Sequence, residues 1–181
     1  YTGPRSYEPS PHSLYRNDGD GTFTDVSQPS GIASHHGPGM GLIAADYDGD
    51  GHTDIFVLND VFGNFCWRND GQGHFEEVAL VNGLKYNGDG VPMGSMGVDC
   101  GDYDHDGQFD FFQTSYQGEP PALFRNLGNG TFQDVSRLTG ANAGGLENVK
   151  WGCGFSDFDN DGHPDIFYVN GHLQDNVELY D

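Results

Sequence analysis

The stretch that decides the fold reads DYDGDGHTD at residues 46–54, and it recurs as DYDHDGQFD at 102–110 and as DFDNDGHPD at 157–165. In all three copies positions 1, 3, 5 and 9 are Asp, and position 6 is Gly. The copies follow one another at a period of about 55 residues, and a fixed period of this length indicates that each repeat is one supersecondary unit.

A second motif alternates with the first and reads RNDGDGTF at 16–23, RNDGQGHF at 68–75 and RNLGNGTF at 125–132. Each copy joins two short apolar runs, and its glycines supply the positive φ angles that a hairpin turn needs. Each copy also begins with an arginine (Arg16, Arg68 and Arg125). Because the arginine recurs in every repeat, we expect a structural ion pair with an acidic neighbour rather than a role in substrate recognition.

The segments around both motifs have the composition of strands. A glycine lies five positions before each Asp-rich loop (Gly41, Gly97 and Gly152), and we interpret it as a strand position where another backbone approaches closely. Apolar and aromatic runs follow the loops at 55–58, 111–112 and 166–169. Nowhere does an apolar period of 3.6 residues persist for three turns, so the sequence predicts almost no helix.

These patterns predict an all-β fold of β-propeller-like blades. Each blade has four antiparallel strands, and the acidic loop joins the first two. The alternative arrangement is a solenoid of stacked hairpins. We expect one repeat domain over residues 1–181, with three units at roughly 12–59, 60–115 and 116–181. A closed propeller needs about four to eight blades, so three repeats predict a partial propeller or one completed by oligomerisation.

The acidic loops have the chemistry of a calcium site. Alternation at positions 1, 3 and 5 places three carboxylates inside a tight turn, the glycine allows the chain to reverse, and the ninth residue closes the site. Hard oxygen ligands in this number suit Ca²⁺, with about one ion for each of the three loops. By analogy with other calcium loops, the backbone carbonyl at position 7 is a further ligand. The predicted ligand residues are Asp46, Asp48, Asp50, His52 and Asp54, then Asp102, Asp104, Asp106, Gln108 and Asp110, then Asp157, Asp159, Asp161, His163 and Asp165.

Two other interpretations of the loops are weaker. Solvated Asp-Gly turns without cations would leave carboxylates repelling one another by about 4 kcal/mol per pair at 4 Å and an effective dielectric constant of 20. An EF-hand needs Glu at position 12 and flanking helices, whereas position 12 here is Val57, Gln113 or Tyr168. Mg²⁺ prefers near-ideal octahedra that retain water, and Zn²⁺ prefers Cys and His.

The loop between a glycine-containing strand and an Ile-Phe strand resembles the calcium loop of FG-GAP/VCBS repeats. More narrowly, residues 14–26 and 151–167 resemble the bacterial ASPIC/UnbV group, which is related to cartilage acidic protein. The resemblance covers nearly the whole chain. It implies a secreted, calcium-bound β-propeller, and it offers no established catalytic chemistry.

Composition limits the choice of partners. Lys and Arg number 7 against 28 Asp and Glu, which gives a net charge of −21 and argues against nucleic acid and anionic membranes as partners. No apolar run approaches the roughly 20 residues of a membrane span, so we expect no membrane insertion. We expect no signal peptide within residues 1–181. Three cysteines permit at most one internal disulfide, and small buried side chains in strands are the alternative.

The sequence leads to three hypotheses of function. The first is a calcium-stabilised extracellular or cell-surface module for binding or adhesion, because millimolar calcium outside cells keeps weak sites filled. It would recognise protein or glycan through segments that differ between repeats, at 28–38, 80–92 and 138–150. The turns at 60–62, 116–117 and 172–174 also differ between repeats, and the candidate ligand contacts in and beside all these segments are His35, His36, Tyr86, Tyr116, Trp151 and His172. These segments could also be simple connectors.

The second hypothesis is a structural protein that assembles into a homo-oligomer or a filament through unpaired strand edges. The third is a polysaccharide-active enzyme, which would require a cleft with paired acids outside the calcium loops. The sequence contains no Ser/His/Asp or Cys/His set that can be nominated as catalytic, so we expect that the protein is not an enzyme.

Overall fold

The computed structural model describes residues 3–173. Two four-stranded antiparallel sheets form its centre. The first blade contains β5 (Gly39–Ala45), β6 (Asp54–Asn59), β7 (Phe65–Asn69) and β8 (Phe75–Glu77), paired in that order. The second blade contains β9 (Ser95–Gly101), β10 (Asp110–Ser115), β11 (Ala122–Asn126) and β12 (Phe132–Asp134), also paired in chain order.

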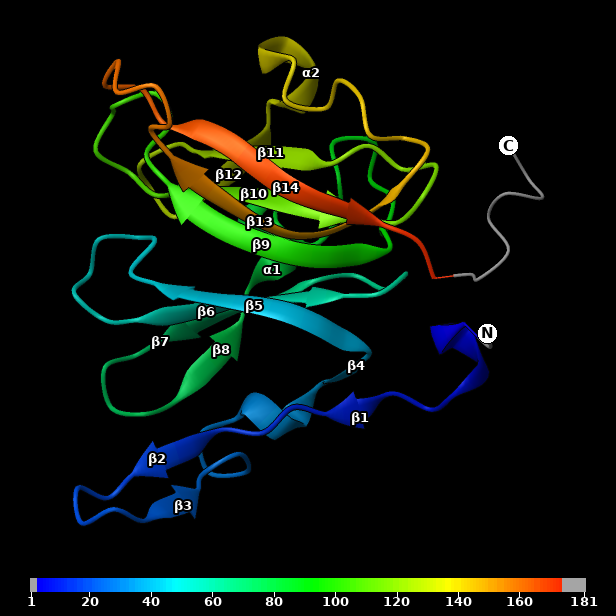
Figure 1. The fold of residues 1–181 in the computed structure, drawn as a ribbon. Helices are drawn as coiled ribbons and strands as arrows, with labels where there is room; N and C mark the ends of the chain where they lie inside the picture. Colours follow the sequence, from blue (N-terminus) through cyan, green and yellow to red (C-terminus); the bar gives the residue numbers. More distant parts are fainter. Residues whose placement is uncertain (1–2, 174–181) are drawn as a thin grey trace.

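Two-stranded sheets flank these blades (Figure 1). Towards the N-terminus β2 (Tyr15–Asn17) pairs with β3 (Phe23–Asp25), and β1 (Ser10–Pro11) pairs with β4 (His36–Gly37). Towards the C-terminus β13 (Val149–Ser156) pairs with β14 (Asp165–Gly171). The predicted all-β fold and its four-stranded antiparallel sheets are therefore confirmed.

Helix is confined to single turns in the described residues: η1 (Pro4–Ser6), η2 (Ile32–Ser34), α1 (Ala79–Asn82) and α2 (Ser136–Thr139). Three of them lie in the connections between one sheet and the next. Within residues 3–173, none of these helices has the length and apolar character needed to cross a bilayer.

The sheets are offset from the sequence units. The unit 60–115 begins with β7 and β8 of the first blade and ends with β9 and β10 of the second. Each acidic loop joins the first two strands of a sheet, as predicted. The second and third Gly-rich hairpins join a third strand to a fourth, and the first joins the two strands of the β2–β3 sheet. The boundaries of the sequence units therefore depend on where in the repeat one begins to count, and they do not coincide with the boundaries of the sheets. The end of the last unit lies outside the described residues.

The first strands of successive sheets, β5, β9 and β13, lie side by side and run in the same direction (Figure 1). We call them the inner strands. Their glycines explain the spacing, since a Cβ on Gly41 would lie 2.7 Å from the carbonyl oxygen of Met96, and one on Gly97 would overlap the carbonyl oxygen of Trp151. The next glycine in the series, Gly152, has no atom within 4 Å of its Cβ position. Close backbone approach is therefore confirmed for the first two glycines.

Aromatic rings fill the space between the sheets. Phe56 of β6 stacks on Phe111 of β10 with ring centroids 5.1 Å apart, and Phe111 stacks on Phe132 at the same distance. Phe112 and Tyr168 stack at 6.1 Å between the second blade and β14. These rings are the large groups that a chain with few hydrophobic residues buries instead of a long aliphatic core.

The three cysteines are free and lie in strands, and of the three only Cys66 is buried, whereas Cys100 and Cys153 are partly buried. Cys66 is completely buried, and burial raises the pKa of its thiol to about 12. Burial also raises the pKa of Cys153 to about 12. Thiols in this state react slowly, because the thiolate is the reactive form.

Candidate metal centres

The acidic loops begin where the inner strands end, all on one side of the molecule (Figure 1). The first aspartate of each loop closes the turn on itself. Both oxygens of Asp46 accept backbone hydrogen bonds, from Gly49 and Gly51, at 2.9 Å. Gly51 has a φ of 88°, a left-handed conformation that explains the glycine at position 6. Gly107 and Gly162 repeat it, with φ of 86° and 92°, and donate to Asp102 and Asp157 at 2.9 Å.

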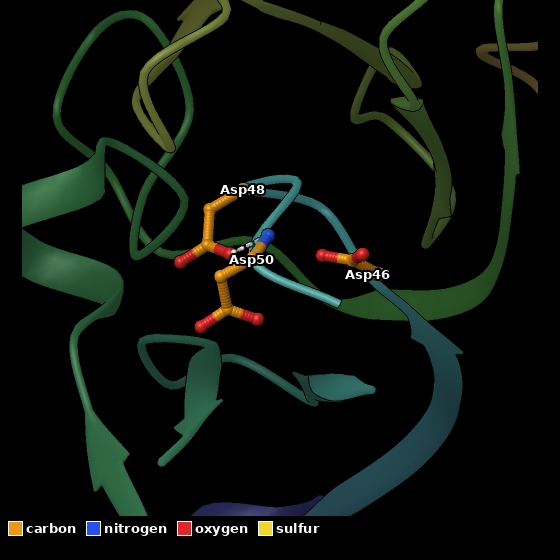
Figure 2. A group of neighbouring side chains, drawn as sticks. All are labelled: Asp46, Asp48 and Asp50. Carbon is orange, nitrogen blue, oxygen red and sulfur yellow. Dashed lines mark hydrogen bonds between the residues drawn. The ribbon is translucent and has the colours of Figure 1, made fainter. Parts of the chain in front are cut away.

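This turn brings the predicted carboxylates together. Figure 2 shows Asp46, Asp48 and Asp50 arranged around the turn that follows β5. In each loop, three carboxylates contribute oxygens that lie within 4.8 Å of one another. At that distance and an effective dielectric constant of 20, each pair repels by about 3.5 kcal/mol. The three groups are Asp46, Asp48 and Asp50; Asp102, Asp104 and Asp110; and Asp157, Asp159 and Asp165.

One carboxylate oxygen in the second group has no hydrogen-bond partner in the described part of the chain, and this leaves it available to a cation. Oδ1 of Asp104 is buried and accepts no hydrogen bond within the described residues. Its other oxygen lies 2.7 Å from Nε of Arg125, whose Nη2 lies 3.2 Å from Asp106. An unpartnered buried carboxylate oxygen is costly, and a hard cation held by Asp102, Asp104 and Asp110 would satisfy it. The residues present therefore fit Ca²⁺.

In both four-stranded blades the ninth aspartate of the acidic loop is buried. Asp54 and Asp110 are 1% and 0% exposed, and each binds two backbone N–H groups. Asp54 accepts from Tyr47 at 3.3 Å and from Asn69 at 2.8 Å. Asp110 makes the same pair of bonds with loop position 2 and with Asn126 of the hairpin. This aspartate therefore ties the acidic loop to the hairpin of its own blade.

Burial raises the pKa of both Asp54 and Asp110 to about 6, and the neighbouring loop carboxylates add to the effect. A carboxyl group whose pKa is raised on folding binds protons more tightly in the folded state, so it adds stability as the pH falls through 6 and loses it as the pH rises.

We therefore expect the calcium-free chain to become more stable between pH 7 and pH 5, by about 1.3 kcal/mol for each of these two groups. The calcium-loaded chain should show the opposite slope, because protons compete with the ion for the same oxygens. Thermal melts in EGTA and in excess calcium at both pH values test this. His12, whose pKa is lowered by burial and by His36, acts against the first trend. Equal slopes with and without calcium would contradict the assignment.

The residues at position 7 contact the loops through their backbone N–H groups. His52 and His163 each donate to the position-5 carboxylate at 2.8 Å, and Gln108 does so at 3.0 Å. The imidazole of His163 lies 3.2 Å from that of His105 in the neighbouring loop. The ring of His52 lies over Gly71. Ligation by the carbonyl groups at position 7 stays a prediction.

The repeated arginines do form ion pairs with acidic neighbours, but the partner changes from one repeat to the next. Arg16 pairs with Asp18 at 2.9 Å, and Arg68 with Glu76 at 2.7 Å. Only Arg125 contacts an acidic loop among the ion pairs of the described residues. Exposed pairs of this kind contribute little to stability, about 0 to 1 kcal/mol.

The six candidate ligand contacts are not one site. His35 packs edge-on against Phe65 and Trp67, with ring centroids 5.7 and 5.4 Å apart, and His36 is exposed in β4. Tyr86 lies against Gly63. Tyr116 and Trp151 line one cavity on the side opposite the acidic loops. His172 is exposed, and the residue that follows it in the sequence lines the same cavity.

Sequence reasoning missed two features of the loops. It did not assign the hairpin residues Asn69 and Asn126 to the acidic loops, although both follow an arginine at the same place in each motif. It also missed Arg125 as a cation on Asp104 and Asp106. Recurrence of Arg-Asn beside every acidic loop was the available signal.

Comparison with known proteins agrees with this geometry. The FG-GAP-like repeat family matches residues 6–57, 46–113 and 102–168. Each acidic loop lies inside a match, and the matches overlap at the first two loops.

Each curated relative aligns with a longer part of the chain than any single family match does. Cartilage acidic protein 1 of Xenopus tropicalis is 27% identical over 176 residues, and the human protein is 28% identical over 178 residues. The alignments cover 91% of this chain but only 26% and 25% of those proteins, so the chain spans about a quarter of their length. The mouse protein gives 28% identity over 183 residues, with 91% and 26% coverage.

One similar solved structure is a lectin from Agrocybe aegerita, described as recognising non-reducing terminal N-acetylglucosamine. It has a TM-score of 0.49 and 19% identity, and the alignment covers 88% of this chain and 42% of that one. The family matches together extend from residue 6 to residue 168. The chain belongs to the FG-GAP-like repeat family.

Proposed function

We propose that this protein is a calcium-stabilised extracellular binding module that recognises protein or glycan through its variable segments. The observation that carries the proposal is that each of the three loops gathers three carboxylates, with a buried oxygen of Asp104 left without a donor. Calcium would neutralise the clusters and fix the loops, and no catalytic group is required for that role.

The division between the two ends of the sheets supports a binding role. The acidic loops and the hairpins share one end, as the bond from Asn69 to Asp54 requires. The opposite end carries the turns after β6 and β10 and the connections between sheets, which are the segments that differ between repeats. Variable loops on a rigid repeated scaffold are where binding specificity usually lies.

The chemistry of the loops supports an extracellular location. Extracellular calcium modules bind the ion with dissociation constants of about 0.1–1 mM, so the calcium found outside cells would fill loops of that class. Three bound ions would also offset part of the charge of −21 that otherwise destabilises the compact chain.

A glycan array, together with a panel of purified extracellular protein domains, tests the proposal when it is read in calcium and in EGTA. We expect binding to one ligand class that is lost in EGTA and returns with calcium. Replacing residues 140–148 with a Gly/Ser linker of equal length is a matched control, because it changes the variable side, keeps the buried Val149 and Lys150 of β13 and leaves every acidic loop intact. Binding that is equal in EGTA, or turnover of a glycan, would contradict the proposal.

Self-assembly is the second candidate, and the two-stranded sheets favour it. The pair β2–β3 corresponds to the third and fourth strands of a blade, and β13–β14 to the first and second. Phe167 and Val169 on β14 are 58% and 46% exposed. The two pairs from different copies would make one four-stranded blade. Light scattering in calcium tests this, because a monomer at all concentrations argues against assembly.

A further inference from the structure

A cavity of about 380 Å³ opens at the beginning of the inner strands, on the side away from the acidic loops. We call it the axial cavity. Met40, Met96 and Trp151 line it, and each of them directly precedes the inner-strand glycine of its repeat. Asp60 and Tyr116, from the turns after β6 and β10, face the same space. The volume lies in the range of sites that hold small ligands or single side chains.

Asp60 is the unusual member of this lining. It is 8% exposed, yet within the described chain no backbone or side-chain group donates a hydrogen bond to its carboxylate. Burial of most of the residue raises its pKa. Its carboxylate oxygens are not among the fully buried atoms without a partner, so water in the cavity can reach them, and a ligand that donated a hydrogen bond to them would replace that water.

The protein supplies no cation to this carboxylate. No ion pair of the described residues includes Asp60. Lys150 is the one buried base of the described residues, and its ammonium group donates instead to three carbonyl oxygens, of Tyr116 at 3.2 Å, Gly145 at 2.8 Å and Asn148 at 3.1 Å. With its donors used in this way, Lys150 holds the connection before β13 in place. Within the described residues, Asp60 therefore has no positive partner.

The rest of the lining suits a cation with an apolar stem. Trp151 is half-buried, and the faces of tryptophan and tyrosine rings attract ammonium groups within about 6 Å. The thioethers of Met40 and Met96 adapt their shape to an aliphatic chain. A neutral sugar fits less well, because it would leave the charge of Asp60 unpaired and would find few other hydrogen-bonding side chains.

We propose that the axial cavity binds an aliphatic ammonium group of the kind that a lysine side chain carries. The ammonium would pair with Asp60 and lie against Trp151, with its methylene groups along the two methionines. This inference deepens the proposed binding role by naming the chemistry of one contact, and it rests on that role for its biological meaning.

Titration with n-butylammonium in saturating calcium tests the proposal. Tryptophan fluorescence reports the cavity, because the other tryptophan, Trp67, is 1% exposed. We expect a saturable change that Asp60→Asn weakens about tenfold, the size of a desolvated charge contact. Asp89→Asn is the matched control. It removes the same charge from an exposed carboxylate paired with Arg137 outside the cavity, and it should leave binding within about twofold.

Met40→Lys gives an independent reading. Met40 is 47% exposed, so a lysine there can reach into the cavity without disturbing the core. Its own ammonium should occupy the site and abolish the response to n-butylammonium, whereas Met40→Gln should retain it. This variant keeps the proposal testable if Asp60→Asn fails to fold.

Several results would overturn the inference. They are the absence of a saturable change, an unchanged affinity in Asp60→Asn or Met40→Lys, and equal binding of n-butanol or of a methyl glucoside. Melts of the same samples in EGTA separate this inference from the proposed function. A calcium-dependent melt without n-butylammonium binding defeats only the cavity, and the reverse result defeats only the calcium role.

Discussion

Removal of calcium with EGTA is expected to lower the melting temperature of this protein by about 15 °C or more. Calcium at about 10 mM is 100 times a dissociation constant of about 0.1 mM, and a ligand at that excess stabilises the folded state by about 2.7 kcal/mol per site, so three such sites together contribute about 8 kcal/mol. In a domain of this size, 1 kcal/mol changes the melting temperature by about 2–4 °C. The total is comparable with the whole stability of an ordinary domain, about 5–15 kcal/mol.

The physical reason is the geometry of the loops. Three carboxylates share a space 4.8 Å across in each of them, and neighbouring charges of one sign raise the free energy of the folded chain. Adding excess calcium after EGTA should restore the melt, and magnesium should restore it less well because it demands near-ideal octahedral geometry. Superimposable melts in calcium and in EGTA would show that the clusters are solvated turns.

Gly97→Ala should destabilise the chain by about 3 kcal/mol and lower its melting temperature by about 6–12 °C. The new Cβ would overlap the carbonyl oxygen of Trp151, which is backbone and cannot rotate away. Thr114 makes the position still less tolerant. Its hydroxyl accepts a hydrogen bond from the N–H of Gly97 at 2.8 Å and donates one to the carbonyl of Trp151, which holds the two inner strands together.

Gly152→Ala is the matched control at the equivalent position of the next repeat. No atom lies within 4 Å of its Cβ position, so we expect no loss and a gain of up to about 1 kcal/mol from the restricted unfolded chain. Thermal melts of the two variants in calcium decide the matter. Equal effects at the two positions would contradict the close packing of β9 on β13.

The sequence predicted the parts of the fold that repeat. The acidic loop, the Gly-rich hairpin and the inner-strand glycine each recur at one position in every copy, and each expresses a local backbone requirement. The grouping of strands into sheets was harder to predict than these repeated features. Residues 12–59 contain an outer pair of one sheet and an inner pair of the next, and pairing between strands is not recorded in the period of the sequence.

The contacts that differ between repeats could not be predicted. Arg68 and Arg125 occupy the same place in the motif, yet one pairs with Glu76 and the other with Asp104 and Asp106. Whether a hydrogen-bond donor reaches the Asp60 carboxylate depends on the side chains that the neighbouring blade places around it. Three repeats contribute to the cavity around Asp60, and their side chains meet only after the sheets pack. Such features depend on tertiary contacts, which a single sequence does not show.

The number of calcium ions bound per chain tests the central claim most directly. Native mass spectrometry or equilibrium dialysis against calcium can count them. The loop geometry predicts three ions for the wild-type chain and two for the double variant Asp102→Asn/Asp104→Asn, which changes one cluster and leaves the other two intact. A count of zero in millimolar calcium, or the same count in both chains, would contradict the assignment of the acidic loops as calcium sites.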